Sequence, residues 1–201
     1  MRALVLNYGV GNLFSISSAL KRVGFDVHIS SDLEYDYDLL VLPGVGSFKA
    51  LGPYIEKEGY VLKEAVSKVS AILGICLGMQ ILFEYSTEYG YSKGLGILEG
   101  YVDRIITSKK LPHIGWDKVY LFNKNDKCEV FAKLDGKYVY FVHSYVVYPR
   151  HLDHICMLSH YDMLFPAAIA YRNIFGTQFH PEKSGSTGKQ LLEAIAQWIK
   201  R

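Results

Sequence analysis

The feature that most constrains the fold is an apolar run that ends on a cysteine between two glycines, residues 71–80 (Ala-Ile-Leu-Gly-Ile-Cys-Leu-Gly-Met-Gln). Residues 71–75 carry no polar side chain, which is typical of a strand buried on both faces. The run continues into G-x-C-x-G and then a helical pattern, which together have the form of a nucleophile elbow. Gly74 and Gly78 leave room for the chain to pass close to itself. Cys76 is therefore expected at a sharp strand-to-helix turn.

The rest of the first half alternates strand and helix signals. Apolar positions recur every three or four residues in the helical segments, and Gly24 stands where a left-handed helix cap is wanted. Strands joined by helical crossovers imply a mainly parallel sheet. We predict strands at Ala3–Leu6, Phe25–Ser30, Asp38–Leu42 and Ala71–Ile75, a turn at Tyr8–Asn12, and helices over 13–23, after Cys76, and over 47–69 with an interruption near Gly59.

After about residue 94 the pattern changes to short strand-like runs, which suggest antiparallel additions to the sheet edge. A final helix over 187–200 carries its apolar side chains on one face. We predict one α/β domain over 1–201, an open, mainly parallel twisted sheet flanked by helices, with antiparallel additions in the C-terminal half. The short runs are 94–106, 116–122, 138–145, 155–160 and 167–180.

Charge and cysteine content exclude several functional classes. The net charge of +2 gives no case for a nucleic-acid or anionic-membrane partner. Residues 71–83 are too short and too interrupted to cross a bilayer, and no targeting segment is visible, so we expect a cytoplasmic protein. Cys76, Cys128 and Cys156 are odd in number and widely spaced, which predicts no disulfide framework or zinc ribbon and favours a reducing compartment.

A cysteine at a helix N-terminus is favoured as a thiolate, and a thiolate that attacks a carbonyl needs a proton carrier. The best of seven histidines is His180, in the run Thr-Gln-Phe-His-Pro-Glu-Lys at 177–183. Because proline biases the preceding residue to extended geometry, His180 and Glu182 can project to one side. Glu182 would then orient the imidazole, and His180 would act on Cys76 as general base and later as acid.

An acyl-transfer site also needs donors for an oxyanion. Residues 42–46 (Leu-Pro-Gly-Val-Gly) follow a predicted parallel strand and offer the backbone amides of Gly44 and Val45 near the crevice where α/β sheets bind ligands. Leu77, directly after the cysteine, offers another amide. Gln80 lies one helical turn past Cys76 and could hold a polar substrate or serve as a buried amide.

Three segments together resemble the class I glutamine amidotransferases, namely G-I-C-L-G-M-Q, F-H-P-E-K-S and P-G-V-G-S-F. Within that class, N-Y-G-V-G-N, Met79 and L-P-H-I-G-W at 111–116 are similar to the glutaminase subunits of imidazole glycerol phosphate synthase. The resemblance covers nearly the whole chain from Leu6. It implies hydrolysis of glutamine through a Cys-His-Glu triad, without cofactor or resident metal, and delivery of ammonia to a cyclase subunit, a (β/α)₈ barrel, in a heterodimer of histidine biosynthesis.

The same resemblance implies roles for two further groups of residues. The residues implied to hold glutamine are Gly46, Gln80, Ser144 and Tyr145, and those implied at the partner interface and ammonia route are Asn12, Trp116, Tyr140 and Lys183. A glutaminase of another synthase, such as anthranilate synthase, and a noncatalytic partner-binding module of the same fold are the alternatives. A dinucleotide site at Gly9 and Gly11 lacks the third glycine of its fingerprint. A metal site at His151, His154, Cys156 and His160 has no supporting carboxylate.

Overall fold

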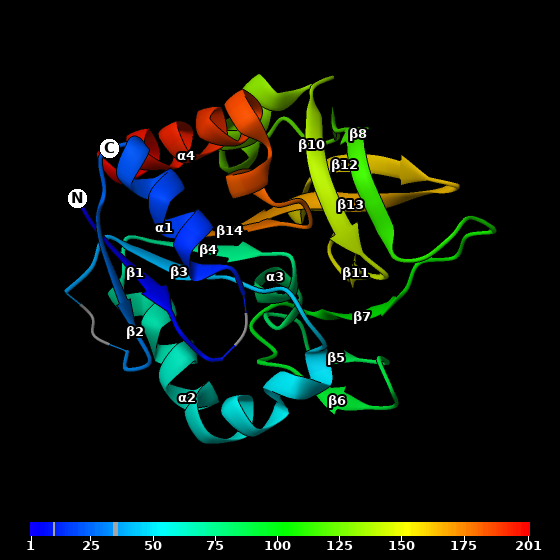
Figure 1. The fold of residues 1–201 in the computed structure, drawn as a ribbon, viewed down its shortest axis with the longest axis horizontal. Coiled ribbons are helices and arrows are strands. Elements are labelled where there is room, and N and C mark those ends of the chain that lie inside the picture. The colour runs from blue at the N-terminus through cyan, green and yellow to red at the C-terminus, as the bar shows by residue number, and fades with distance from the viewer. Residues whose placement is uncertain (10, 34–35) are drawn as a thin grey trace.

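A computed structural model describes residues 1–9, 11–33 and 36–201, and an eight-stranded open sheet runs through its centre (Figure 1). Five strands lie parallel and three follow antiparallel at one edge, so the predicted mainly parallel α/β fold with antiparallel additions is confirmed. In spatial order the strands are β2 (Asp26–Ser30), β1 (Arg2–Leu6), β3 (Leu39–Leu42), β4 (Ala71–Ile75), β14 (Ile174–Thr177), β13 (Met163–Tyr171), β12 (Ile155–Tyr161) and β9 (Tyr120–Leu121).

Helices cover both faces of the sheet because its strands are apolar on both sides. Ala3 and Val5 of β1 pack with α1 (Leu13–Arg22) and α4 (Gly185–Ile199), while Leu4 and Leu6 pack with α2 (Gly52–Lys68) on the other face. Figure 1 shows α1 and α4 on one side and α2 on the other. The remaining helices are short: α3 (Leu77–Gln80) and the 3₁₀ turns η1 (Phe48–Leu51), η2 (Asp126–Leu134), η3 (Leu152–His154) and η4 (Pro181–Lys183).

The early elements match their predicted ranges closely, with one error. Gly24 has a φ of +93°, as expected of a left-handed cap. The predicted interruption near Gly59 is wrong, because α2 continues through it. A Cβ at Gly59 would lie 3.4 Å from the Leu95 side chain, so this glycine allows close packing and does not break the helix. Of the predicted turn Tyr8–Asn12, Val10 lies outside the described residues.

The expectation that all later strands add to the main sheet edge is also wrong. β14 joins its parallel part, and six strands form two smaller sheets beside it. Burial alternates along residues 138–143 in the structure, whereas the sequence predicted only a strand-like run, which does not identify a pairing partner. The smaller sheets are β10 (Tyr138–His143) with β8 (His113–Lys118), and β11 (Tyr145–Pro149), β7 (Gly100–Arg104), β5 (Tyr85–Ser86) and β6 (Ser92–Lys93).

Cys128 and Cys156 form a disulfide, which corrects the prediction that no cysteines are paired. Cys128 lies on η2 and Cys156 on β12, and both are buried where η2 packs against the sheet. A sequence separation of 28 residues does not indicate that η2 packs against β12. The prediction of a reducing compartment rested on unpaired cysteines, and the disulfide removes that basis. None of the helices in the described part of the chain combines the length and hydrophobicity that crossing a bilayer requires.

Candidate active site

Cys76 lies at the sharp turn between β4 and α3 that the sequence predicted. Its φ of +51° is in the left-handed region, which is costly for a residue with a side chain and is held by the surrounding packing. A Cβ at Gly78 would lie 1.8 Å from the Leu42 carbonyl oxygen, and one at Gly74 would lie 2.7 Å from the Gly78 carbonyl oxygen. Only glycine fits at either position, so the two glycines form the elbow that presents the cysteine.

His180 follows β14, the strand next to β4. The Cys76 backbone N–H donates to the Thr177 carbonyl oxygen at 2.6 Å, which fastens the elbow to the end of that strand. His180 Nδ1 lies 2.9 Å from Glu182 Oε1, and both side chains are almost fully buried. Among the described residues, His180 Nε2 and Glu182 Oε2 are buried with no hydrogen-bond partner. The predicted pairing of His180 with Glu182 is therefore present, with the second ring nitrogen free to meet a ligand.

The charge state of His180 depends on its two neighbours. Burial lowers the pKa of the ring, but the Cys76 thiol and the Glu182 carboxylate outweigh burial and raise that pKa to about 10. Because Nε2 makes no well-directed hydrogen bond to Cys76, the influence of the thiol is one of proximity and charge. The protonated imidazole is favoured at neutral pH, and a positive ring beside a cysteine favours the thiolate.

Gln178 contacts the nucleophile and was not singled out in the sequence. Its Nε2 lies 3.4 Å from Cys76 Sγ, and its Oε1 accepts a hydrogen bond from Gln80 Nε2 at 3.1 Å. Gln80 Nε2 also donates to the Tyr145 carbonyl oxygen at 2.9 Å. The signal was available, because Gln178 stands two residues before His180 in an extended segment and two-residue spacing brings side chains to one face.

A cavity of about 270 Å³ opens beside the cysteine. It gathers Cys76 with all four residues predicted to hold glutamine and with Val45 of the predicted oxyanion segment. The residues on its wall that sequence reasoning missed are Glu88, Tyr89, Pro112, Val142 and His143. Glu88 accepts a hydrogen bond from the Phe48 backbone at 2.6 Å, and burial raises the pKa of its carboxyl group. No motif in the sequence marks Glu88, which follows the short strand β5.

Two of the three residues predicted to supply oxyanion donors, Gly44 and Leu77, lie side by side. A Cβ at Gly44 would be 2.6 Å from the Leu77 Cβ and 2.9 Å from the Gly78 amide nitrogen, so residues 44 and 77 are in contact across the turn. Leu77 is the first residue of α3, and its N–H has no acceptor within the helix. Gly46 has a φ of +135°, a conformation that favours glycine.

Three of the four predicted interface residues form one contact chain. The Trp116 and Tyr140 rings meet edge to face at 5.9 Å between centroids, and Lys183 Nζ lies 5.7 Å from the centre of the Tyr140 ring. Trp116 is 51% exposed, which leaves this cluster open to a partner. Asn12 does not join this cluster; its side chain caps α1 by accepting a hydrogen bond from the Ser15 N–H. Asn12 is exposed, and its neighbour Gly11 packs against residues 43 and 44.

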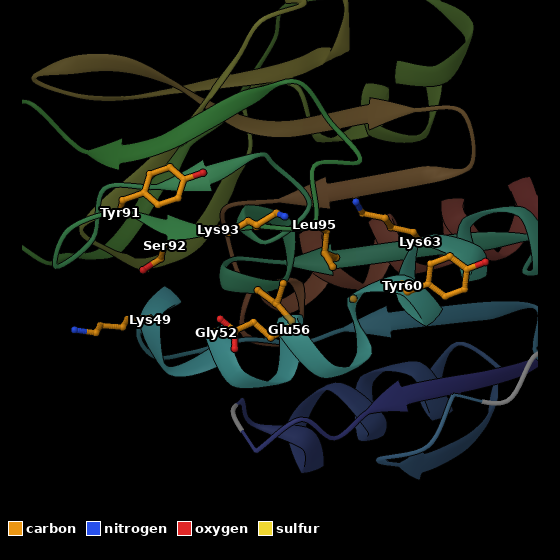
Figure 2. A pocket seen from close by; sticks show the side chains of 12 residues that line it. Lys49, Gly52, Glu56, Tyr60, Lys63, Tyr91, Ser92, Lys93 and Leu95 are labelled. Carbon is orange, nitrogen blue, oxygen red and sulfur yellow. The ribbon is translucent and has the colours of Figure 1, made fainter.

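A larger cavity, of about 610 Å³, lies between α2 and residues 91–95 (Figure 2). Among the described residues that line it, none is a predicted catalytic residue. The described part of the chain also holds no group of three or more His, Cys, Asp or Glu side chains placed to bind a metal ion. The His151 and His154 rings instead contact each other in a tilted arrangement, and Cys156 is in the disulfide.

Comparison with known proteins agrees with this geometry. Residues 4–197 match the family described as glutamine amidotransferase class-I. The chain is 53% identical to the imidazole glycerol phosphate synthase subunit HisH of Saccharolobus solfataricus over 201 residues, covering 100% of both chains. It is 41% identical to the subunit of the same name from Caldanaerobacter subterraneus over 200 residues, covering 98% of both.

Solved structures share the fold at lower identity. PurLQS from Thermotoga maritima superposes with a TM-score of 0.76 at 24% identity, covering 98% of both chains. A solved glutamine amidotransferase gives a TM-score of 0.72 at 18% identity, covering 99% of both. The chain belongs to the class I glutamine amidotransferase family and, within it, to the HisH subunits of imidazole glycerol phosphate synthase.

Proposed function

We propose that this enzyme hydrolyses glutamine to glutamate and ammonia through Cys76, His180 and Glu182. The observation that carries the proposal is the elbow cysteine at the wall of a cavity, beside a buried histidine whose Nδ1 is held by Glu182 and whose Nε2 has no partner among the described residues. Gln178 and Glu182 fix the two reacting side chains, which reduces the entropy lost on reaching the transition state.

The reaction begins with attack of the Cys76 thiolate on the side-chain carbonyl carbon of glutamine. The carbonyl oxygen becomes an oxyanion, for which we propose the amides of Gly44, Val45 and Leu77 as donors, because residues 44 and 77 are in contact and Val45 lines the cavity. As the C–N bond breaks, protonated His180 gives its Nε2 proton to the leaving nitrogen and ammonia departs. Water then attacks the glutamyl thioester, His180 takes the proton of that water, and glutamate leaves with the thiolate restored.

The cavity also provides for the amino-acid end of glutamine. The Glu88 carboxylate lies on the same wall as Gly46, Gln80 and Tyr145 and is suited to pair with an α-ammonium group. Ser144 supplies a hydroxyl for the α-carboxylate. A cavity of about 270 Å³ matches one small amino acid better than a peptide.

We further propose that the ammonia passes to a cyclase subunit, a (β/α)₈ barrel, which makes imidazole glycerol phosphate and AICAR for histidine biosynthesis in the cytoplasm. The HisH identity of its relatives supports this synthase over anthranilate synthase. The exposed Trp116 and Lys183 flank Tyr140, whose carbonyl oxygen accepts from the His180 backbone N–H at 2.9 Å. A partner bound there would be close to the point where ammonia is released.

Substitution of the nucleophile tests the function directly. Cys76→Ser should abolish glutamine-dependent synthesis by the two-subunit complex, whereas synthesis supplied with ammonium salts should continue at the wild-type rate because the cyclase is unchanged. Release of glutamate from glutamine by the Cys76→Ser complex at the wild-type rate would reject the assignment. Loss of both activities would indicate that the complex has failed to assemble, and size-exclusion chromatography would detect that failure. The test is then repeated with the milder substitution Cys76→Ala.

A further inference from the structure

Two buried histidines connect the protein surface to the wall of the candidate active site. His113 Nε2 lies 2.6 Å from Asp117 Oδ2, and His113 Nδ1 lies 3.1 Å from His143 Nε2. His143 Nδ1 lies 3.1 Å from the Tyr145 carbonyl oxygen. All three distances are hydrogen-bond distances, so the side chains form a continuous chain from a carboxylate to the backbone of residue 145.

The rings of this chain are held rigidly. His113 is 1% exposed and His143 is 5% exposed. The His113 ring stacks on Tyr161 at 4.1 Å and on Phe141 at 5.0 Å between centroids, and Phe165 contacts both histidines. Buried polar nitrogens persist in such an apolar setting only when they are hydrogen-bonded.

Counting protons fixes the charge of the complete chain. Asp117 and the Tyr145 carbonyl oxygen at its two ends only accept hydrogen bonds, so three bonds need three ring N–H groups. Two neutral imidazoles carry two. With only two ring N–H groups, one of the three contacts would place a nitrogen lone pair against another acceptor, which is repulsive. The complete chain therefore carries one additional proton, with Asp117 as its counter-charge.

The charged groups around the rings indicate which one holds that proton. Burial, together with His113 and His180, lowers the pKa of His143 to about 3 against the opposing effect of its hydrogen bond to the Tyr145 carbonyl oxygen. Burial, with Lys109, also lowers the pKa of His113, but there the Asp117 carboxylate offsets part of that effect. Tyr161 contributes a neutral ring. The proton is thus best placed on His113, beside Asp117, while neutral His143 donates through Nδ1.

We propose that Asp117, His113 and His143 form a positioning relay, in which one shared proton lets His143 hold the Tyr145 carbonyl oxygen and so fixes the glutamine-binding edge at Ser144 and Tyr145. That carbonyl oxygen also accepts from Gln80 Nε2 at 2.9 Å, so it joins the relay to a second wall of the cavity. The catalytic part of this inference rests on the proposed glutaminase function. The relay itself does not, because its protons can be observed without turnover.

The protonation state is tested by ¹⁵N NMR of the full chain with labelled histidine, assigned with single-histidine variants. At pH 5, because the pKa of His113 is lowered from its usual 6.5, the wild type should show three protonated nitrogens on His113 and His143, and Asp117→Asn, which keeps an acceptor oxygen but removes the charge, should show two. Two protonated nitrogens in the wild type would overturn the shared proton, whatever the outcome of the activity assays.

Kinetics test the positioning role. His143→Asn places an amide N–H near the position of Nδ1 and should keep the Michaelis constant for glutamine close to wild type, whereas His143→Gln places it near Nε2 and should raise that constant roughly tenfold, with kcat little changed. The Michaelis constant for glutamine should rise with pH as the relay loses its shared proton. In Asp117→Asn this rise should begin at a lower pH. The control His154→Asn alters a buried histidine that contacts the Tyr171 ring, outside the relay.

The kinetic outcomes separate the two hypotheses. Equal KM values for His143→Asn and His143→Gln, or an Asp117→Asn pH profile identical to wild type, would reject the positioning role. Absence of glutamine hydrolysis by the wild-type complex would reject the proposed function instead and leave the NMR result to decide the relay.

Discussion

At the scale of single residues, the site depends on groups that would be unfavourable elsewhere in the molecule. Cys76 occupies a positive φ, and His180 has a buried Nε2 with no partner among the described residues. Each carries a free-energy cost of about 1–3 kcal/mol in a folded protein. Such costs persist where function requires them, and here they meet at one cavity wall.

The link between His180 and Glu182 predicts a pH dependence of stability. The pKa of His180 is raised from its usual 6.5 to about 10, so its ionisation contributes stability that is fully present below pH 6.5 and is lost as the pH rises through 10. Glu182→Gln removes one of the causes of that raised pKa. The free energy of unfolding in guanidinium should therefore fall between pH 6.5 and 10 in the wild type, and fall less in the variant.

A matched control uses a surface pair. Glu193 lies 3.4 Å from Lys189 on an exposed face of α4, so Glu193→Gln should keep the wild-type pH dependence. Parallel curves for the wild type and Glu182→Gln across this pH range would show that Glu182 does not hold the proton on His180.

At the scale of elements, the elbow depends on contact between the backbones of β3 and α3. A Cβ at Gly78 would lie 1.8 Å from the Leu42 carbonyl oxygen, and no flexible side chain is there to move away. Gly78→Ala should lower the free energy of unfolding by about 3 kcal/mol and abolish glutaminase activity, because α3 must shift away from β3.

Gly52→Ala is the control for that substitution. Gly52 begins α2 with a φ of −48° and has no heavy atom within 4 Å of a new Cβ. Thermal denaturation should show an unchanged or slightly raised midpoint for Gly52→Ala, since alanine favours the helix. A Gly78→Ala variant as stable and as active as Gly52→Ala would contradict the packing argument.

The disulfide ties η2 to β12 across 28 residues. Closing a loop of this length restricts the unfolded chain, so Cys128→Ala with Cys156→Ala should lower the free energy of unfolding by roughly 3–4 kcal/mol. Glutamine hydrolysis at moderate temperature should not change, because neither cysteine lines the active-site cavity. Denaturation of the wild type with and without reductant provides the comparison. Equal stability under both conditions, with two titratable thiols gained, would contradict this prediction.

Much of the fold could be predicted because local signals and tertiary structure agree over residues 1–80. Apolar runs such as Ala71–Ile75 indicate buried strands, and the G-x-C-x-G pattern after such a run indicates an elbow. The second half was harder, because β7 and β8 pair with β11 and β10 in separate small sheets. Pairing partners, the disulfide and Glu88 depend on distant contacts, which leave no periodic trace in the sequence.

At the scale of the whole molecule, Tyr140 contacts both the exposed candidate interface and the candidate catalytic histidine. Its ring lies between Trp116 and Lys183 on an exposed face, and its backbone carbonyl oxygen holds the N–H of His180. The Tyr140 N–H in turn donates to Ser184 Oγ at 3.0 Å, and Ser184 Oγ donates to the His180 carbonyl oxygen at 2.6 Å. Contacts made by a partner on this face therefore reach His180 through two short hydrogen-bonded paths.

Because a partner bound on this face would lie near His180, we predict that the free chain is a poor glutaminase and becomes active in the complex when the partner carries its own substrate. Residues 43–46 include two glycines, so the oxyanion amides can turn inward or away, and the productive form can be a minor population. A partner that binds the inward form about 100-fold better supplies about 2.7 kcal/mol, enough to raise a 1% population to about half.

The measurement compares the glutaminase rate of the free chain with that of the complex, with and without the substrate of the partner, in the wild type and in Trp116→Ala. Trp116 is half exposed and contacts Tyr140, so its truncation should leave the basal rate of the free chain unchanged and reduce activation. Tyr120→Ala, which removes a similarly exposed ring on β9, is the control and should activate normally. A free chain that already works at the full rate would refute the switch, and normal activation of Trp116→Ala would place the transmitting contact elsewhere on this face.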